Sequence, residues 1–376
     1  MRILYLTPWY PSSRDAMLGL FVQKHVECVR AQGEDVRVIS SQGLLASWRQ
    51  WRQLRREGWQ PDVVQLNVIQ KQGLLAMWLR WRYKTPYIIV EHWSGYLPEN
   101  GQYMHSSAFH RRMAECIVRH AQQVLTVSQK LADSMQACGL KHPHYELIHN
   151  VVDDFFYSRK SKVESRKTRD ESRESRDGSR KTRDESRESR VKRLLHISCF
   201  DEHAKNVKGL LSAAKALSKK RQDWRLVLVG TGVDYTSVRA FARDLDIPND
   251  LLVWRGELPP REVAKELQQA DAFVLFSNYE NAPVVISESL ASGVPVVASA
   301  VGGIPEMVPS TCGELVPAGD ETALEEALMR MLDHYQDYDP DAIRREGERY
   351  SFEAVGKKLC QIYQEAICTD YSAHTK

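Results

Sequence analysis

Short buried strands alternate with amphipathic helices along this 376-residue chain, and this alternation limits the possible folds more than any other feature. Residues 2–7 form an apolar run typical of a buried strand, and residues 19–33 follow with helical periodicity. Further strands are expected at residues 35–40, 61–68, 85–93, 122–128 and 145–153. Strands that alternate with helices predict βαβ units and a parallel, doubly wound sheet.

The same pattern starts again after residue 190. Strands are expected at residues 191–198, 224–232, 251–256 and 271–276, with helical segments between them. A chain of this length is also too long for one ordinary core. We therefore expect an α/β protein with two Rossmann-like, doubly wound parallel-sheet domains, at residues 1–158 and 191–351, followed by an amphipathic helix.

A charged linker of low complexity, residues 159–190, separates the two halves. The twelve-residue string SRKTRDESRESR occurs in it twice, at 165–176 and at 179–190. Since the repeat holds no aromatic or aliphatic side chain to bury, it is expected to be disordered or a solvated helix. A tandem duplication in a tolerant linker is the simpler interpretation, and an electrostatic tether to an anionic surface is the alternative.

The distribution of charge differs between the halves. Residues 1–159 carry 19 Lys and Arg against 13 Asp and Glu, whereas residues 191–376 carry 21 against 28. This asymmetry suggests that the halves face different partners. No window approaches the ~20 apolar residues of a spanning helix, and the seven scattered cysteines suggest reduced thiols. We expect a cytoplasmic protein, with peripheral contact at the cytoplasmic membrane face left open.

The stretch YENAPVVISESLASGVPVVASAVGGIPEMV, residues 279–308, holds the strongest chemical signal. Pro283 suits the start of a helix over 284–292, and Gly293 suits its end. The free amides at that helix start follow an apolar strand, where open α/β sheets bind anions. A nucleotide-sugar fits this layout, with phosphates at the helix start and hydroxyls near Glu280 and Glu288. Taken singly, Glu280 is better explained as a surface loop residue and Glu288 as an ordinary helical residue.

Residues 277–308 as a whole closely resemble the retaining glycosyltransferases of family 4, which have the GT-B fold. Their signature is Glu, seven residues, Glu, a Gly-Val-Pro-Val-Val segment and a Gly-Gly-x-Pro-Glu turn. Residues 1–26, 127–156, 196–211 and 226–232 add to the resemblance, which extends over most of the chain. It implies two domains that face a cleft: an acceptor domain (1–158) and a nucleotide-sugar domain (191–351). It also implies that the last helix, about 352–376, packs back on the first domain.

The resemblance implies a role for each matching residue. Glu288 would bind the ribose hydroxyls, and Glu280 would bind the transferred sugar near its reacting face. Lys205 would neutralise the departing diphosphate, which needs a fixed cation where no metal is present. His92 would lie near the anomeric carbon, and Gly19 would let the backbone approach the phosphates. The loop before the helix would contact the diphosphate and sugar through its backbone (Asn281, Ala282, Pro283 and Val284).

The chain departs from the family pattern at two positions. Cys199 stands where the family has an arginine shortly before the lysine, so one of two expected phosphate cations is missing. Leu18 replaces the first glycine of the usual Gly-Gly loop. Lys208, or an arginine elsewhere, is the expected substitute for the missing cation.

Residues 44–84 are rich in tryptophan and basic residues. They hold five Trp and eight Lys or Arg, against only two acidic residues. Such a composition is typical of a helix that lies on an anionic membrane. The alternative is a domain helix with its tryptophans in the core and its arginines in solvent. The acceptor or membrane face is expected at Trp48, Arg49, Trp51, Arg52, Arg55 and Arg56.

The function implied by the resemblance is transfer of a sugar, with retained anomeric configuration, from an NDP-sugar to a hydroxyl of a glycan or lipid-linked acceptor. Cell-surface polysaccharide or lipopolysaccharide biosynthesis is the expected setting. The nucleotide-sugar is then a substrate, and neither a metal, another cofactor nor nucleic acid is expected. Two alternatives remain: a GT-B sugar-nucleotide epimerase or hydrolase, and a non-catalytic glycan-binding protein.

Overall fold

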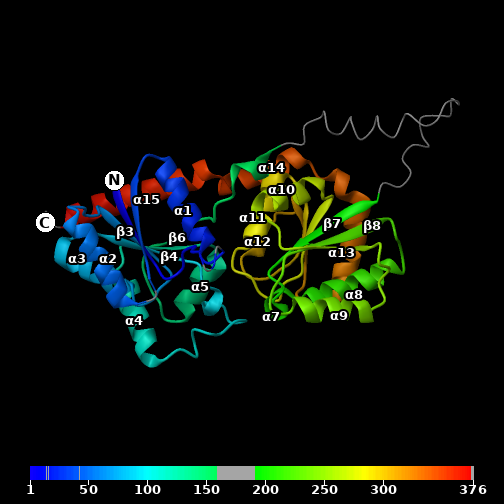
Figure 1. Ribbon diagram of the computed structural model, residues 1–376, viewed down its shortest axis with the longest axis horizontal. Helices are drawn as coiled ribbons and strands as arrows, with labels where there is room; N and C mark the ends of the chain where they lie inside the picture. The colour runs from blue at the N-terminus through cyan, green and yellow to red at the C-terminus, as the bar shows by residue number, and fades with distance from the viewer. Residues whose placement is uncertain (14, 16, 42, 159–190, 374–376) are drawn as a thin grey trace.

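The computed structural model describes residues 1–158, apart from residues 14, 16 and 42, and residues 191–373. The predicted charged linker at 159–190 lies outside the described residues. Two six-stranded sheets, one in each half of the chain, are each built of parallel strands with helices on both faces (Figure 1). This arrangement confirms the predicted α/β class with two doubly wound parallel sheets.

The first sheet has the strand order β2-β1-β3-β4-β5-β6. Its central strands are buried on both faces, because helices cover both sides. The last strand ends earlier than expected, at Leu147, because the following segment leaves the sheet and pairs Val152 with Ser351. The strands are β1 (Arg2–Thr7), β2 (Asp35–Ser40), β3 (Val63–Asn67), β4 (Tyr87–Glu91), β5 (Gln123–Thr126) and β6 (Tyr145–Leu147).

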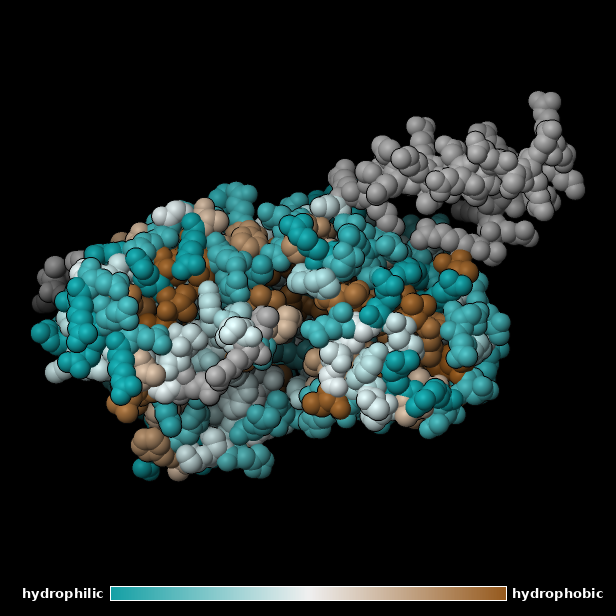
Figure 2. Space-filling model, viewed as in Figure 1, coloured by the Kyte–Doolittle hydropathy of each residue, from teal (hydrophilic) through white to brown (hydrophobic). Residues whose placement is uncertain are grey.

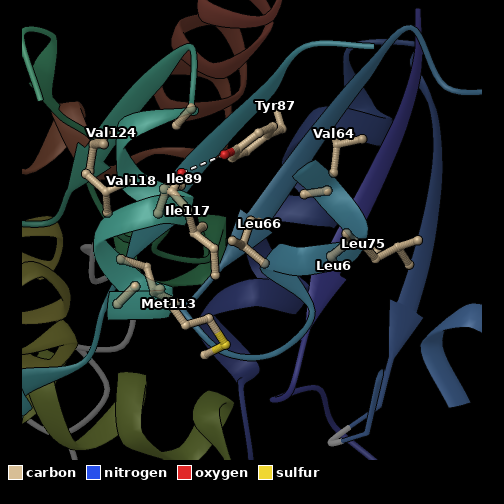
Figure 3. Packing of buried hydrophobic residues seen from close by; sticks show 14 of the residues in the cluster. Leu6, Val64, Leu66, Leu75, Tyr87, Ile89, Met113, Ile117, Val118 and Val124 are labelled. Atoms are coloured by element: carbon tan, nitrogen blue, oxygen red, sulfur yellow. Dashed lines mark hydrogen bonds between the residues drawn. The ribbon is translucent and has the colours of Figure 1, made fainter. Parts of the chain in front are cut away.

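Helix α1 (Leu20–Ala31) covers one face of this sheet. The other face carries α2 (Leu44–Arg56), α3 (Gly73–Tyr83), α4 (Ala108–Arg119) and α5 (Gln129–Ala137). Figure 3 shows Met113, Ile117 and Val118 of α4 packed toward Leu66 and Ile89 of the sheet. There the hydroxyl of Tyr87 donates to the carbonyl oxygen of Ile117 at 2.6 Å, which satisfies the one polar atom of a buried ring.

The second sheet has the order β12-β11-β10-β7-β8-β9. Helices α8, α9 and α13 cover one face, and α10, α11, α12 and α14 the other. The strands are β7 (Lys192–Ile197), β8 (Trp224–Val229), β9 (Leu252–Gly256), β10 (Ala272–Leu275), β11 (Val296–Ser299) and β12 (Gly313–Val316). The helices are α7 (Glu202–Lys205), α8 (Val207–Ser218), α9 (Tyr235–Asp244), α10 (Pro260–Gln269), α11 (Val284–Ser292), α12 (Ile304–Met307), α13 (Glu321–His334) and α14 (Pro340–Gly347).

The last helix, α15 (Phe352–Ala373), returns to the first sheet and lies beside α1 (Figure 1). Its residues Leu359 and Tyr363 are buried in the same core as Tyr5 of β1. The hydroxyls of Tyr363 and Tyr5 are 2.7 Å apart, and Tyr363 also donates to Gln65 at 2.5 Å. The C-terminal segment is therefore part of the core of the first half.

Helix α2 packs its tryptophans inward. Trp51 is only 1% exposed and belongs to the core, and Trp48 is half-buried against Trp78, with ring centroids 4.4 Å apart. The interpretation of Trp51 as part of an exposed membrane or acceptor face is therefore wrong. Its indole fills the space between α2 and the sheet, so the core alternative holds for this residue. Among the helices of the described residues, none is long and apolar enough to cross a membrane.

Candidate active site

The site is built around the loop of residues 277–283, which joins the end of β10 to α11. Helix α11 begins after Pro283 and ends at Gly293, whose φ of 74° gives the left-handed cap. These bounds match the helix expected from the sequence. The first amides of α11 therefore point out of the carboxyl end of the second sheet, where a helix start favours an anion.

Lys205 and Glu280 form an ion pair in this loop region. The ammonium nitrogen of Lys205 donates to Oε1 of Glu280 at 2.5 Å, and the hydroxyl of Ser277 donates to the same oxygen at 2.9 Å. Glu280 is only 7% exposed. Burial opposes the charge on Lys205, but the Glu280 carboxylate more than offsets it, so the pKa of Lys205 lies above its ordinary value.

Two backbone features hold this ion pair in place. The amide of Asn278 donates to the carbonyl oxygen of Ala204 at 2.8 Å, which fastens the loop to α7. Gly302 packs directly on the loop: a Cβ there would lie 1.6 Å from the carbonyl oxygen of Glu280. The Gly-Gly turn noted in the sequence is thus the support on which the Glu280 backbone rests.

Glu288 lies in the second turn of α11 and is partly buried. Among the described residues none donates a hydrogen bond to its carboxylate. Burial raises its pKa to about 8, and the nearby Asp153 carboxylate adds to the rise. Asp153 in turn is paired with Lys24 of α1 at 2.8 Å. The carboxylate that is predicted to bind ribose is thus a hydrogen-bond acceptor without a partner among the described residues.

The loop of residues 277–283 also contacts the first domain. The side-chain amide of Asn281 donates to the carbonyl oxygen of His92 at 2.9 Å, and its Oδ1 accepts from the hydroxyl of Ser128 at 3.1 Å. The amide of Asn150 donates to the carbonyl oxygen of Ala282 at 3.2 Å. The structure therefore brings predicted residues of both domains, His92 and the donor-side loop, into one site.

His92 follows β4 and lies under α1. The Phe21 ring is 4.3 Å from its ring, centroid to centroid, and the His25 ring is 5.5 Å away. Burial lowers the pKa of His92 well below its ordinary value; His25 adds to this effect, and the nearby Asn150 side chain opposes it. His92 is thus held as a neutral imidazole.

Glu91 is a residue of this site that the sequence analysis missed. Its fully buried carboxylate accepts hydrogen bonds from the backbone amides of Ile69, His92 and Trp93 and from the hydroxyl of Tyr96. It therefore shapes the turn that presents His92. The only signal in the sequence was an acidic residue at the end of an otherwise apolar strand.

The expected phosphate contacts are only partly in place. Gly19 caps α1 with φ of 70°, and a Cβ there would lie 2.4 Å from the Trp9 backbone, so the loop needs glycine. Cys199 is exposed after β7. The ammonium of Lys208, the expected substitute for that arginine, lies over the ring of Phe241, 5.9 Å from its centroid.

The basic residues of α2 lie away from this site. In Figure 1, α2 is at the far end of the first domain from α11. Arg49, Arg52 and Arg56 are exposed, while Arg55 lies over the rings of Trp51 and Tyr83. These arginines therefore do not line the site around Lys205 and Glu280. In the part of the chain that the structure describes, no cluster of His, Cys, Asp and Glu could hold a metal ion.

Two family models match the chain. Residues 21–151 match the "Glycosyl transferase 4-like domain", and residues 179–348 match the "Glycosyl transferases group 1". The two matches correspond to the two halves that carry the two sheets. The second match includes Lys205, Glu280 and Glu288.

Curated relatives are similar over shorter segments. The chain is 32% identical over 123 residues to the lipopolysaccharide 1,6-galactosyltransferase of Escherichia coli, which is 32% of this chain and 33% of that protein. It is 31% identical over 161 residues to the N-acetyl-alpha-D-glucosaminyl L-malate synthase of Bacillus anthracis, which is 42% of this chain and 39% of that protein. The matched segments thus span between a third and two fifths of these relatives.

Solved structures share the whole fold. Sucrose-phosphate synthase from Thermosynechococcus elongatus aligns with a TM-score of 0.74 and 17% identity, covering 98% of this chain and all of that one. Anabaena HepE in complex with UDP aligns with the same TM-score and identity, covering 97% of this chain and all of that one. The two family matches, taken with this fold, show that the chain belongs to the GT-B glycosyltransferases of the family 4 type.

Proposed function

We propose that the protein transfers a sugar from an NDP-sugar to a hydroxyl of a glycan or lipid-linked acceptor, with retention of the anomeric configuration. The observation that carries this proposal is the buried Lys205–Glu280 pair beside the start of α11, opposite His92 of the other domain. Lys205 and the first amides of α11 can bind a diphosphate. The carboxylate of Glu280 can accept hydrogen bonds from sugar hydroxyls. Glu288, which has no hydrogen-bond donor among the described residues, is left for the ribose.

The proposed reaction exchanges one bond at the anomeric carbon for another. The bond between the anomeric carbon and the diphosphate oxygen breaks, and a bond from the acceptor oxygen to that carbon forms on the same face. The departing phosphate oxygen gains negative charge as this happens, and it can take up the proton that the acceptor hydroxyl loses. Lys205 and the amides of α11 stabilise that charge beside the buried Glu280, where electrostatic interactions are stronger than in water.

We propose that the reaction needs no metal ion. The family resemblance implies a metal-free reaction, and Lys205, with its pKa held above its ordinary value, is charged at neutral pH. Turnover should therefore persist in EDTA. Loss of turnover in EDTA, with rescue by Mn²⁺ or Mg²⁺, would contradict this part of the proposal.

The setting that we propose is synthesis of lipopolysaccharide or another surface polysaccharide. The E. coli relative is named as a lipopolysaccharide galactosyltransferase, and a Salmonella typhimurium protein of the same name is 24% identical over 65% of this chain. UDP-sugars are the donors to test first, since HepE was solved with UDP and with UDP-glucose.

A thermal-shift screen against UDP-, GDP-, ADP- and TDP-sugars tests the donor. A ligand at a hundredfold excess over its Kd stabilises the fold by about 2.7 kcal/mol. The donor that stabilises is then incubated with candidate acceptors, and proton NMR of the product shows whether the anomeric configuration is retained. Donor consumed without acceptor would indicate the epimerase or hydrolase alternative, and binding without any turnover would indicate the glycan-binding alternative.

We also propose peripheral contact with an anionic membrane, through the outer surface of α2, α3 and α4, which lie side by side. This surface carries exposed arginines together with large exposed apolar side chains: Leu45 is 77% exposed, Trp81 73% and Phe109 75%. In Figure 2 this end of the molecule is mostly hydrophilic, with hydrophobic residues at its lower edge. Such a mixture suits a surface of acidic headgroups, and it would bring a lipid-linked acceptor close.

A further inference from the structure

A chain of hydrogen bonds holds the loop that joins β7 to α7. It runs from the carbonyl oxygen of Val274 in β10, through His196 and Ser198, to the amide of Phe200. His196 Nδ1 is 3.0 Å from the Val274 carbonyl oxygen, and its Nε2 is 2.9 Å from the Ser198 hydroxyl. The Phe200 amide donates to the same hydroxyl oxygen at 3.3 Å.

The contact with Val274 fixes the proton of the His196 ring. A carbonyl oxygen can only accept, so Nδ1 carries a proton. The ring is 0% exposed, and burial lowers the pKa of His196 to about 4; the Val274 carbonyl opposes this effect, and the nearby Lys205 cation adds to it. The ring is therefore neutral at neutral pH and holds this one proton, which makes Nε2 an acceptor. Turning the ring over would place carbon atoms against both partners.

The direction of the Ser198 hydrogen bonds follows. Because His196 Nε2 can only accept, the hydroxyl of Ser198 donates its single proton to that nitrogen. The hydroxyl oxygen keeps its lone pairs and accepts from the Phe200 amide. Ser198 thus ties the Phe200 backbone to the strand that carries His196.

Phe200 needs such a tie, because its backbone adopts a conformation that residues other than glycine rarely take. Its φ is 43°, in the left-handed region. The Phe200 ring is 0% exposed and packs against Tyr235 and Trp254, with centroids 5.2 and 6.1 Å away. Strained backbone persists only where its surroundings hold it, here through the ring packing and the Ser198 hydrogen bond.

The turn at Phe200 leads directly into α7, which ends at Lys205. The carboxylate of Asp201 accepts from the amides of His203 and Ala204, at 3.1 and 3.4 Å. The carbonyl oxygen of Asp201 accepts from the amide of Lys205 at 2.7 Å. The Lys205 backbone is therefore fastened to the residue that follows the turn.

We propose that His196 and Ser198 are positioning residues that place Lys205 for its contact with the departing diphosphate. Their hydrogen bonds hold the turn at Phe200, and the turn sets where α7 begins. Both act through the backbone of the loop, so the role requires no contact with substrate. It rests on the proposed function, in which Lys205 stabilises the leaving group.

The hydrogen bonds can be tested without substrate. Full-length protein labelled with ¹⁵N-histidine is studied by long-range ¹H–¹⁵N NMR, and the His196 signals are identified as those that vanish in His196→Asn. We expect a protonated Nδ1 and an unprotonated Nε2, and the Nε2 signal should shift in Ser198→Ala, which removes its donor. A proton on Nε2, or an Nε2 signal that is unchanged in Ser198→Ala, overturns the proposal.

Kinetics test the effect on Lys205. Ser198→Ala should lower kcat about tenfold and leave the Kd for NDP unchanged, because Lys205 is displaced and not removed. Ser198→Thr keeps the hydroxyl and should keep the parent kcat. The matched control is Ser218→Ala, since Ser218 is also buried and donates to a backbone carbonyl oxygen, at 2.8 Å, within α8. A kcat of Ser198→Ala equal to that of Ser218→Ala overturns the role given to Ser198.

A double variant tests whether the two residues act together. His196→Asn keeps a donor for the Val274 carbonyl but removes the acceptor for Ser198, so it should lower kcat as Ser198→Ala does. Because both changes break one chain, the double variant should be no slower than either single variant. Losses that multiply would overturn the proposal. Absence of transfer with every NDP-sugar would instead refute the proposed function and leave the NMR result intact.

Discussion

The side-chain amide of Asn281 donates a hydrogen bond to the carbonyl oxygen of His92 at 2.9 Å, although 189 residues separate them in the chain. Asn281 belongs to the loop that carries Glu280, and His92 directly follows a strand of the other sheet. One hydrogen bond therefore joins the donor side of the site to the acceptor side. The carboxylate of Glu91 accepts hydrogen bonds from the amides of His92 and Trp93. The loop therefore contacts a turn that is itself fixed by hydrogen bonds.

Glu306 makes another contact between the domains, on the far side of the Gly-Gly turn from Glu280. Its two carboxylate oxygens accept from the backbone amides of Gln129 and Lys130, at 2.7 and 2.9 Å, at the start of α5. These amides are unpaired within their own helix, and the helix dipole favours a negative charge there. Glu306 follows the Gly-Gly turn that supports Glu280, so closure of the domains and placement of the loop depend on the same short segment.

We predict that Glu306→Ala shifts the ligand-free protein toward an open arrangement. Each lost charge-assisted bond contributes about 1.5–3 kcal/mol, less where solvent screens it, so roughly a tenfold shift is expected. Small-angle X-ray scattering should show a larger radius of gyration. The control is Glu262→Ala, which breaks an ion pair within α10 only. An unchanged radius in Glu306→Ala would show that other contacts keep the domains closed.

Lys205→Ala should lower kcat by about a hundredfold or more, as loss of one preorganised charge-stabilising group does. Nucleotide affinity should change much less, because the charge of Lys205 matters most when the diphosphate leaves. The matched control is Lys208→Ala, since Lys208 lies over Phe241 and should leave turnover unchanged. Steady-state kinetics and calorimetry with NDP make the comparison.

A stability effect must be separated from that kinetic effect. Lys205→Ala leaves the Glu280 carboxylate buried without its cation, which destabilises the fold. The double variant Lys205→Ala, Glu280→Gln should therefore recover melting temperature but not turnover. Near-normal turnover of Lys205→Ala would show that another cation stabilises the leaving group.

Most of the fold could be predicted from the sequence because its elements carry strong local signals. The helix over 284–292 was bounded by Pro283 and Gly293, two residues whose backbone preferences decide helix ends regardless of tertiary context. Strand β4 is apolar up to Glu91, and such an apolar strand is expected to be buried on both faces, as it is. Glu280, Lys205 and His92 could be placed in one site only through the family resemblance, since 75 and 189 residues separate the contacting positions.

Other features depend on tertiary contacts that no local pattern encodes. Trp51 has the same neighbours in sequence whether its face meets lipid or core, and only the packing of α2 on the sheet decides. Likewise His25 is one of several residues on the buried face of α1, and its place behind His92 follows from how α1 crosses the sheet. Lys208 was a reasonable phosphate ligand by spacing, but the helix directs it toward α9.

Glu288 should make stability depend on pH. Its pKa is raised to about 8 in the folded protein, against ~4.3 in an unfolded chain. The folded state then binds the extra proton between these values, so this contribution is fully present below pH ~4.3 and is lost as pH rises through about 8. Glu288→Gln, which cannot ionise, should show a flatter fall in melting temperature from pH 5 to 8 and be more stable than the parent at pH 8.

The same variant should lose nucleotide affinity, because ribose hydroxyls donate more strongly to a carboxylate than to an amide. In the parent protein, nucleotide binding at pH 7 should therefore release a proton, and the affinity should rise toward pH 8. Calorimetry in two buffers of different ionisation enthalpy measures that release. Equal pH profiles of melting temperature in parent and variant, together with no proton release, would remove Glu288 from this role.

The proposed membrane contact is the outer surface of α2, α3 and α4. Parent protein should sediment with vesicles rich in acidic lipids, and binding should weaken as salt rises, because each Lys or Arg near such a surface contributes about 1 kcal/mol that salt screens. Changing Arg49, Arg52 and Arg56 to Glu should abolish sedimentation without lowering the melting temperature, since these side chains are in solvent.

Two tryptophan variants separate a membrane contact from a core effect. Trp81→Ser removes a side chain that is 73% exposed, so it should weaken vesicle binding and leave the melting temperature unchanged. Trp51→Ser should do the reverse, because it empties a core site, at a cost of about 3–5 kcal/mol for an indole, without touching the surface. If the parent protein does not sediment with acidic vesicles at low salt, the exposed arginines and Trp81 have another purpose, and the acceptor reaches Glu280 from solution.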